Sequence, residues 1–350
     1  MENLDEGWKE ILRAVAARRD LSAAQARWAM DAVMAGAADP ARLGGLLVGL
    51  RAKGETVAEL HGLVAGMAAH AVPVSVDGPV LDIVGTGGDG ANTVNISTMS
   101  AVVAAAAGAR VVKHGGRSAS SRCGSADLLA ELGVVIDLPA PAVSVVLAEV
   151  GIAFCFAPVF HPAMRHAGPV RRALGVPTVF NLLGPLTNPA APAALAVGVA
   201  DAAMAPLVAG VLAGHGVSAL VFRGDDGLDE LSVSTTSRVW SVLGGEVVES
   251  VFDPQEVGVG LSEVDALGGG DPAHNAAVAR RLFAGERGPV RDAVLLSAAA
   301  GLAAAAARPG SPVERIGAHL PTVAAALDDG RAASLVERWA RTTGKVAEAG

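Results

Sequence analysis

A glycine-rich segment, followed by hydroxyl, amide and basic side chains, has the composition of a phosphate site. Residues 85–90 read Gly-Thr-Gly-Gly-Asp-Gly, and Asn95, Ser97, Thr98 and Lys113 follow. Glycines let the backbone approach phosphate oxygens, and the free N–H groups at a helix start bind anions. No acidic residue occurs from 90 to 126, although the chain has a formal net charge of −8. The segment therefore indicates an anion site.

Two other interpretations of these glycines compete with an anion site. Gly85, Gly87 and Gly90 satisfy the dinucleotide fingerprint G-x-G-x-x-G, but that fingerprint needs an acidic residue about twenty positions later. The stretch 108–113 offers only bases, and the Gly-Lys-Ser/Thr ending of a P-loop is also missing. The other alternative is a structural turn beside an exposed basic face. The clustering of donors favours the anion site.

A second group of polar residues, 224–230, follows a strand-like run and reads Gly-Asp-Asp-Gly-Leu-Asp-Glu. Carboxylates at the end of a strand are often turn residues, and this interpretation suits Asp225 and Asp226. Asp229 and Glu230 follow this turn. Zinc is not expected, because no His/Cys set has the spacing of a zinc site.

The pattern after residue 73 predicts an α/β fold with a mainly parallel central sheet flanked by helices. Short apolar runs alternate with alanine-rich helical runs, as in βαβ units. The expected strands are 80–84, 110–113, 134–137, 153–156, 195–199 and 219–222. Functional loops of such sheets lie beyond the carboxyl ends of the strands. The glycine segment, the Lys113 segment, 158–161 and 224–230 are therefore expected at one edge.

The first 72 residues are expected to form a small helical domain, and 73–350 the α/β domain. Trp8, Ile11, Leu12 and Val15 have the spacing of one buried helical face. Capping boxes at 22–25 and 56–59, and an Asp-Pro pair at 39–40, mark further helix starts. Four helices follow from these signals. None carries a catalytic constellation, so a packing or dimerisation role is expected.

The composition limits which classes of protein and which partners are expected. With 350 residues, 51% of them hydrophobic, the chain can bury a large core. Its two cysteines, Cys123 and Cys155, argue against a disulfide framework and favour a cytoplasmic protein. The N-terminus lacks a signal-type apolar stretch, and the apolar run 293–307 is shorter than the roughly 20 residues of a membrane span. Neither a membrane nor a nucleic-acid partner is expected from this acidic chain.

Several segments resemble the signature motifs of anthranilate phosphoribosyltransferases. They are, in order, 85–89, 95–98, 113–115, 117–118, 120–121, 124–127 and 181–189 (Asn-Leu-Leu-Gly-Pro-Leu-Thr-Asn-Pro). The resemblance extends over nearly the whole chain, to 292–296. It implies the nucleoside phosphorylase/phosphoribosyltransferase type of fold. It also implies a homodimer formed through the helical domain, which helices near 165–185 complete.

The resemblance further implies an activity and its site residues. The activity is transfer of 5-phosphoribosyl from phosphoribosyl pyrophosphate to the amine of anthranilate, with release of pyrophosphate, in tryptophan biosynthesis. Residues implied to bind the donor are Gly85, Thr86, Gly87, Gly88, Asp89, Thr93, Asn95, Ser97, Thr98 and Lys113. Residues implied near the acceptor, or in the substrate-binding segment after Lys113, are His114, Gly115, Gly116, Arg117, Ser118, Ser121, Gly124, His161 and Arg171.

Catalysis and metal binding are implied for a smaller set. Asp229, Glu230, Lys113 and Arg171 are the catalytic candidates, with the Arg171 guanidinium on the acceptor's carboxylate. Asp229, Glu230 and Ser97 are the ligands of magnesium, expected as two ions, because Mg²⁺ needs only one or two carboxylates plus substrate phosphates. His161 is open to two interpretations: an acceptor-channel residue, or a helix-start residue before proline.

Three residues depart from the family pattern. The family usually has asparagine at Gly116, a small residue at Cys123 and asparagine at Ser297. Gly116 removes an amide that helps to bind the acceptor. Two interpretations stay open: a neutral change in a tryptophan-pathway enzyme, or a relative with another aromatic or heterocyclic acceptor.

Other classes of protein fit the sequence less well. A nucleoside phosphorylase shares the architecture by analogy, but the chain has no tyrosine. A non-catalytic nucleic-acid-binding relative should have lost the donor motifs and gained a basic surface. A dehydrogenase is disfavoured because the carboxylate for the ribose is missing.

Overall fold

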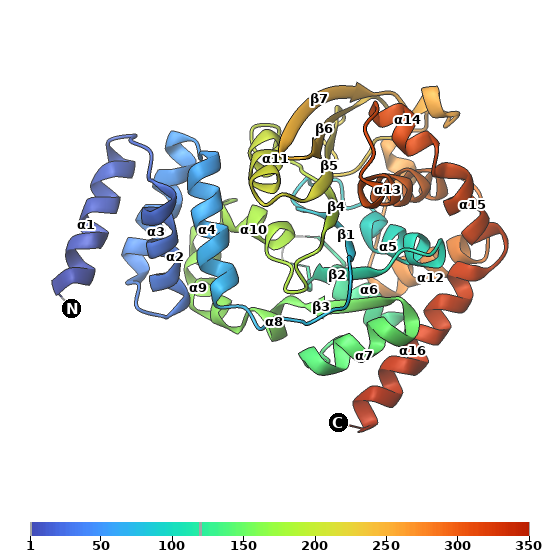
Figure 1. Ribbon diagram of the computed structural model, residues 1–350, viewed down its shortest axis with the longest axis horizontal. Helices are drawn as coiled ribbons and strands as arrows, with labels where there is room; N and C mark the ends of the chain where they lie inside the picture. Colours follow the sequence, from blue (N-terminus) through green and yellow to red (C-terminus); the bar gives the residue numbers. More distant parts are fainter. Residues whose placement is uncertain (1, 119–120, 350) are drawn as a thin grey trace.

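The structure is a computed structural model that describes residues 2–118 and 121–349. Its N-terminal part is helical, as predicted: α1 (Glu2–Ala16), α2 (Ala23–Met34), α3 (Pro40–Lys53) and α4 (Val57–Ala69). These helices stand at one end of the molecule's long axis (Figure 1). Both predicted capping boxes form, at Ser22 and at Thr56. Trp8 is fully buried and packs edge-on against Trp28, with 5.8 Å between ring centroids.

The larger part is built on a seven-stranded sheet of order β3-β2-β1-β4-β5-β6-β7. The strands are β1 (Leu81–Gly85), β2 (Val111–Gly115), β3 (Ile152–Phe156), β4 (Ala194–Gly198), β5 (Ser218–Gly224), β6 (Ser237–Leu243) and β7 (Glu246–Phe252). The first five are parallel to one another, and β6 and β7 are antiparallel. The mainly parallel sheet predicted from the sequence is thus confirmed.

Two features of the sheet differ from the predicted strands. The predicted strand 134–137 is wrong: the segment joins no strand, and the Val135 N–H donates to Thr343 Oγ1 of the C-terminal helix at 3.1 Å. The β6–β7 hairpin was not predicted. Its turn is Gly244-Gly245, and both glycines have positive φ, 61° and 83°, the conformation that tight hairpin turns require.

Helices cover both faces of the sheet. The remaining α-helices are α5 (Ile96–Ala106), α6 (Ser125–Glu131), α7 (Ala140–Val150), α8 (Ala157–Phe160), α9 (Gly168–Leu174), α10 (Phe180–Leu186), α11 (Ala205–Gly214), α12 (Pro272–Phe283), α13 (Pro289–Ala306), α14 (Pro312–Gly317), α15 (Leu320–Asp328) and α16 (Arg331–Ala349). Ile83 packs in the core formed with α5 and α13, whereas its neighbour Val84 packs in the core shared with α1–α4 and α11. Successive residues of β1 therefore face opposite layers.

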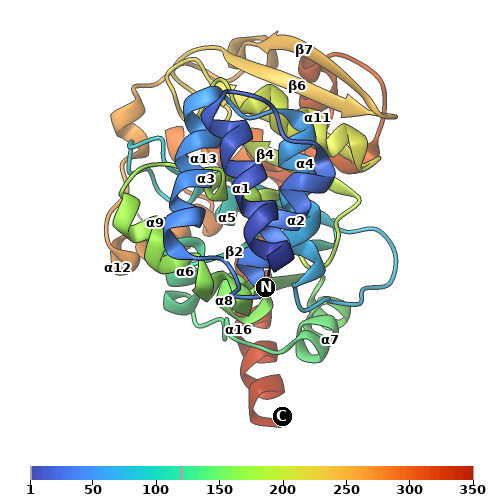
Figure 2. The same ribbon diagram turned by 90° about the vertical axis from the view of Figure 1, so that its left-hand side faces the viewer.

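The helical part and one face of the sheet share a single apolar core. Leu46 and Leu63 of the helices belong to the same cluster of buried side chains as Val197 of β4 and Val221 of β5. Seen from the end of the long axis, α1–α4 stand in front of the sheet (Figure 2). Helix α9 packs on α3, and α10 on α4. This packing fixes the position of α9 and α10 beside the ends of the strands.

Helix α13 is the one described helix that is long and apolar enough to cross a membrane. In the structure 67% of it is buried, against β1, β4 and β5 and against α5. The helix packs so closely on β1 that a Cβ added at Gly301 of α13 would lie only 2.6 Å from Ile83 Cδ1. Helix α13 is therefore a core helix of the α/β part, as the sequence predicts for 293–307.

Candidate active site

A cavity of about 440 Å³ opens at the carboxyl ends of the parallel strands. Strands β1 and β2 end at its wall, with Gly85 and Gly115 as their last residues. Apart from His161, every site residue expected from the sequence lines it: Gly85, Thr86, Gly87, Gly88, Asp89, Thr93, Asn95, Ser97, Thr98, Lys113, His114, Gly115, Gly116, Arg117, Ser118, Ser121, Gly124, Arg171, Asp229 and Glu230. Segments far apart in the sequence thus meet at one edge of the sheet, as predicted.

The glycine segment forms the loop between β1 and α5. Gly87 and Gly88 have φ of 69° and 86°, which only glycine adopts without strain. Asn95 precedes α5 but does not cap it with its side chain. Its amide instead donates to the Cys123 carbonyl at 3.0 Å and accepts from Asn275 Nδ2 at 2.9 Å. Asn95 thereby ties the start of α5 to two other segments of the wall.

Asp229 is held tightly against the glycine loop. The Gly87 N–H donates to its Oδ2 at 2.6 Å. A Cβ at Gly85 would overlap the Asp229 carboxylate, and a Cβ at Gly198 would overlap the Asp229 carbonyl oxygen. The chain therefore needs glycine at the ends of β1 and β4 to bring this carboxylate next to the loop.

The two neighbouring carboxylates are nearly buried, with 8% of Asp229 and 7% of Glu230 exposed. Burial, assisted by the Asp89 charge, raises the pKa of Asp229 to about 7, and burial together with the Asp229 charge raises the pKa of Glu230 to about 8. The Ser297 hydroxyl donates to Glu230 Oε2 at 3.0 Å. Among the described residues, no cationic group lies within 4.0 Å of either carboxylate. Hard oxygen donors crowded together without an ion pair fit a magnesium ion.

Lys113 lies beneath this pair. It is only 2% exposed, and its Nζ donates to the Ile83 carbonyl at 2.6 Å and lies 3.5 Å from Ser97 Oγ. Burial lowers the pKa of Lys113, while the charges of Asp82, Glu230 and Asp229 act in the opposite direction. The Nζ of Lys113 is therefore under the influence of three carboxylates and lies close to the Ser97 hydroxyl.

Asp82 is a site residue that the sequence interpretation missed. It is fully buried on β1, where its Oδ2 accepts a hydrogen bond from Asn188 Nδ2 at 2.8 Å. Burial raises its pKa to about 6, against the effect of the Lys113 charge. An acidic residue inside the apolar run 80–84 was the available signal, because a buried carboxylate needs a partner.

The rings of His114 and His161 lie side by side, tilted to each other, with 5.0 Å between their centres. His114 lines the cavity, and its Nδ1 lies 3.0 Å from the Gly184 carbonyl. Burial and the His161 ring lower the pKa of His114 to about 3, so it is neutral at physiological pH. His161 does not line the cavity; its Nε2 lies 2.9 Å from the Thr187 carbonyl, and it precedes the 3-10 turn Pro162–His166. His161 thus lies at a helix start and outside the lining of this cavity.

Arg171 reaches the cavity from α9. Its Cζ lies 5.2 Å from the centre of the Phe180 ring, a cation–π distance, and burial lowers its pKa. No carboxylate of residues 2–118 or 121–349 lies within 4.0 Å of its guanidinium. The aromatic ring orients a fork of N–H donors that has no acidic partner in the described protein, an arrangement that suits a ligand carboxylate.

The segment after β2 closes one side of the cavity. Asp127 organises it by accepting from Arg117 Nη1 at 2.6 Å and from the Gly124 N–H at 2.9 Å. A Cβ at Gly115 would overlap Ser125 Oγ, whereas among the described residues a Cβ at Gly116 would meet only Ala157 Cβ, at 3.9 Å. Packing therefore requires glycine at 115 and leaves room at 116. Ser120 of the 120–121 motif lies outside the described residues.

Helix α10 adds wall residues that had no assigned role. Phe180, Asn181, Gly184 and Pro185 line the cavity. The first half of the 181–189 motif is helical, because α10 extends over Phe180–Leu186 with Pro185 inside the helix. Asn181 and Gly184 of this motif were the signal in the sequence that the segment lines a ligand site.

Two family models match this chain. One, described as "Glycosyl transferase family, helical bundle domain", matches residues 9–71, and the other, "Glycosyl transferase family, a/b domain", matches residues 77–333. The second match covers more than half of the chain. Fold and cavity thus define a glycosyl transferase with an N-terminal helical bundle.

Similar proteins narrow the class further. Anthranilate phosphoribosyltransferase of Nocardioides sp. is 56% identical over 97% of this chain and 99% of its own length, and that of Acidothermus cellulolyticus is 58% identical over 95% and 94%. The crystal structure of the Thermus thermophilus enzyme has a TM-score of 0.88 at 44% identity, covering 95% of this chain and 99% of that one. The Saccharomyces cerevisiae enzyme in complex with PRPP and Mg has a TM-score of 0.88 at 25% identity, covering 97% and 98%. The chain belongs to the anthranilate phosphoribosyltransferase family.

Proposed function

We propose that this chain transfers 5-phosphoribosyl from phosphoribosyl pyrophosphate to the amine of anthranilate and releases pyrophosphate, a step of tryptophan biosynthesis. One observation carries the proposal: the glycine loop, the buried Asp229–Glu230 pair and Arg171 line the same cavity. The first two suit a metal-bound pyrophosphate, and the third suits an aromatic acid. The family membership supports the same reaction.

The donor occupies the side of the cavity formed by the glycine loop and the start of α5. The backbone of Gly87 and Gly88, free of Cβ atoms, approaches the phosphate oxygens, and the hydroxyls of Ser97 and Thr98 add donors. Lys113 lies beneath them, held by the hydrogen bond from its Nζ to the Ile83 carbonyl. Asn95 holds these segments in register through its bonds to Cys123 and Asn275.

Asp229, Glu230 and Ser97 would hold Mg²⁺, in two ions as we propose. When bound, the metal neutralises the charge that develops on the leaving pyrophosphate. The related yeast enzyme, whose structure is a complex with PRPP and Mg, supports the choice of ion. Ser297 orients the Glu230 carboxylate, because its hydroxyl donates to Oε2.

The acceptor occupies the side of the cavity between α9, α10 and the end of β2. Arg171 binds its carboxylate, and the neutral His114, with Gly115 and Gly116, forms the floor. No protein nucleophile is needed, because the amine of the acceptor attacks the ribose carbon directly. Catalysis then consists of positioning two substrates and stabilising the charge of the leaving group.

The test of this function is a product analysis. The protein is incubated with phosphoribosyl pyrophosphate, Mg²⁺ and either anthranilate or another aromatic or heterocyclic acid, and the products are identified by mass spectrometry. We expect the phosphoribosylated amine of anthranilate as the main product. A product from another acid, and none from anthranilate, would establish the alternative that Gly116 leaves open.

We also propose a homodimer formed through the helical domain of residues 1–72, with 73–350 as the catalytic domain. Val48 of α3 is 47% exposed, an apolar side chain on the surface of this helical part. Sedimentation equilibrium should give twice the chain mass of 34.8 kDa. A monomer mass at micromolar concentration would reject the dimer.

We place the protein in the cytoplasm, where its two buried cysteines stay free.

A further inference from the structure

A second cavity, of about 350 Å³, lies beside the C-terminal end of α13. It is lined by α13, the following turn, α14 and the residues before α15: Ala303, Ala306, Arg308, Pro309, Glu314, Arg315, Ala318 and His319. It shares no residue with the active-site cavity. Figure 1 shows α13, α14 and α15 on the side of the α/β part that faces away from the helical domain.

Arg315 is a buried charge without a counter-charge. It is 6% exposed, and its Nη2 donates to the Ala303 carbonyl at 3.1 Å, near the end of α13. Its enclosed Nε has no hydrogen-bond partner among the described residues. In the described part of the chain no carboxylate lies within 4.0 Å of this guanidinium. Burial lowers its pKa, as desolvation of an unpaired cation does.

Further basic groups surround the same cavity. Arg308 is exposed at its rim and has no ion pair among the described residues. Burial, together with the charges of Arg308 and Arg315, lowers the pKa of His319. The acidic residue of the wall, Glu314, has its Oε2 engaged by the N–H and hydroxyl of Ser311, each at 2.9 Å. The cavity therefore carries a net positive charge.

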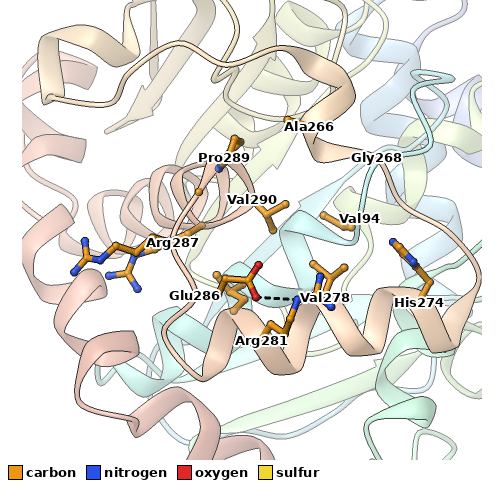
Figure 3. Close-up of a pocket in the computed structure, with 13 residues that line it drawn as sticks. Val94, Ala266, Gly268, His274, Val278, Arg281, Glu286, Arg287, Pro289 and Val290 are labelled. Atoms are coloured by element: carbon orange, nitrogen blue, oxygen red, sulfur yellow. Dashed lines mark ion pairs between the residues drawn. The ribbon is translucent and has the colours of Figure 1, made fainter.

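Another cavity, of about 250 Å³ between α12 and the start of α13, provides the contrast (Figure 3). It is also lined by arginines, but each has an acidic partner. Arg281 pairs with Glu286 at 2.8 Å, as the dashed line in Figure 3 shows, and Arg291 pairs with Asp328 at 2.7 Å. Arg287 lies 3.9 Å from the same aspartate. At the proposed site, the hydrogen bond from Arg315 to the Ala303 carbonyl uses only one N–H of the guanidinium. It therefore does not supply the negative charge of an acidic partner.

We propose that the cavity at the end of α13 is a binding site for a small organic acid, separate from the active site. The carboxylate lies between Arg315 and Arg308, where it supplies the missing counter-charge. The apolar body of the acid packs on the methyl groups of Ala303, Ala306 and Ala318 and on Pro309. A volume of about 350 Å³ suits an acid of the size of a substituted benzoate.

The first test is crystallographic. Crystals of the full chain are soaked with 4-bromobenzoate, whose bromine gives an anomalous signal, and in parallel with selenate, an inorganic oxyanion without an apolar body. We expect bromine density in this cavity with the carboxylate toward Arg315. Density in the active site alone, or in neither cavity, overturns the proposal. Selenate bound here without 4-bromobenzoate also overturns it and leaves an inorganic anion site.

The second test measures affinity in solution. Calorimetric titration with 4-bromobenzoate compares the wild type with Arg308→Ala, Arg315→Met and the control Arg281→Ala. Because Arg308 is exposed, its variant keeps the fold even if Arg315→Met does not. We expect Arg308→Ala to weaken one binding site by roughly tenfold, the loss of a charge-assisted hydrogen bond, with no change in the control. Equal affinity in the wild type and Arg308→Ala rejects the site.

Discussion

Asp229 and Glu230 are adjacent in the sequence, yet the fold buries both beside one loop. The positions of Gly85 and Gly198 explain how: each ends a strand, and each leaves space that Asp229 fills. The burial makes two full negative charges unfavourable without a cation. The pair therefore suits the magnesium ion that we propose.

We predict that Asp229→Asn or Glu230→Gln lowers kcat by at least roughly 100-fold, because a neutral amide stabilises the metal and the leaving group far less. Steady-state rates at saturating substrates measure the effect, and circular dichroism checks the fold. Asp225→Asn is the matched control, since Asp225 lies on the exposed turn of the same loop. Unchanged magnesium-dependent rates in both variants would refute the metal assignment.

Arg171 and its neighbour Arg172 offer a second matched pair. Arg171→Ala should raise the KM for anthranilate by roughly tenfold or more, because one charge-assisted, forked contact is lost. The KM for phosphoribosyl pyrophosphate should stay nearly constant. Arg172→Ala, on the exposed side of α9, should change neither value. A defect confined to the donor in Arg171→Ala would contradict the assignment to the acceptor.

Gly115 and Gly116 differ in the space around them, and this predicts opposite tolerance. Gly115→Ala should lower the free energy of unfolding by about 2 kcal/mol, since its Cβ overlaps Ser125 Oγ. Gly116→Asn should change stability by less than about 0.5 kcal/mol, because within residues 2–118 and 121–349 a Cβ at this position meets Ala157 alone. Urea unfolding measures both. A large loss in Gly116→Asn would mean that packing, rather than acceptor binding, selects glycine there.

At the residue level the sequence motifs placed most of the cavity wall. They failed where a side chain acts from behind the wall. Asp82 sits inside an apolar strand, and Ser297 lies in an alanine-rich helix, so neither belongs to a polar cluster along the chain. The effect of the Asp82 charge on Lys113 and the hydrogen bond from Ser297 to Glu230 arise from strand and helix packing, which no local pattern reveals.

Among the elements, the parallel strands were predictable because each is a short apolar run bounded by turn residues. Residues 134–137 have the same pattern but are paired with Thr343 of α16, which is far away along the chain. The hairpin β6–β7 was missed because β7 is mostly exposed and carries Glu246 and Glu249 among its valines. Exposed edge strands lack the apolar run that marks a buried strand.

The helical part depends on one buried carboxylate. Glu59 accepts hydrogen bonds from the Leu21 N–H at 2.8 Å and the Thr56 N–H at 2.9 Å, and pairs with Lys53 at 2.7 Å. Glu59→Ala should lower the free energy of unfolding by about 3 kcal/mol, because it leaves buried donors unpaired. Glu149→Ala, exposed on α7, should cost under about 0.5 kcal/mol. Equal unfolding midpoints for the two variants would refute this role of Glu59.

For the whole molecule, the shared core between the helices and the sheet has a functional meaning. Leu46 and Val197 belong to one cluster, so the helical part is not a loosely tethered module. Helix α9, which carries Arg171, packs on α3, while the glycine loop belongs to the sheet. The two sides of the cavity are therefore positioned by different parts of the chain. The sequence predicted a helical part and an α/β part, as the structure has them. It could not show that the two parts share a core.

The most direct measurement is the rate of pyrophosphate release from phosphoribosyl pyrophosphate, with and without anthranilate and with and without Mg²⁺. In the proposed transfer the amine would attack the ribose directly and the metal would stabilise the leaving group, so release should require both. Chelation of the metal should abolish it, and readdition should restore it. Release that is equally fast without anthranilate, or none when both are present, would contradict the proposed transfer.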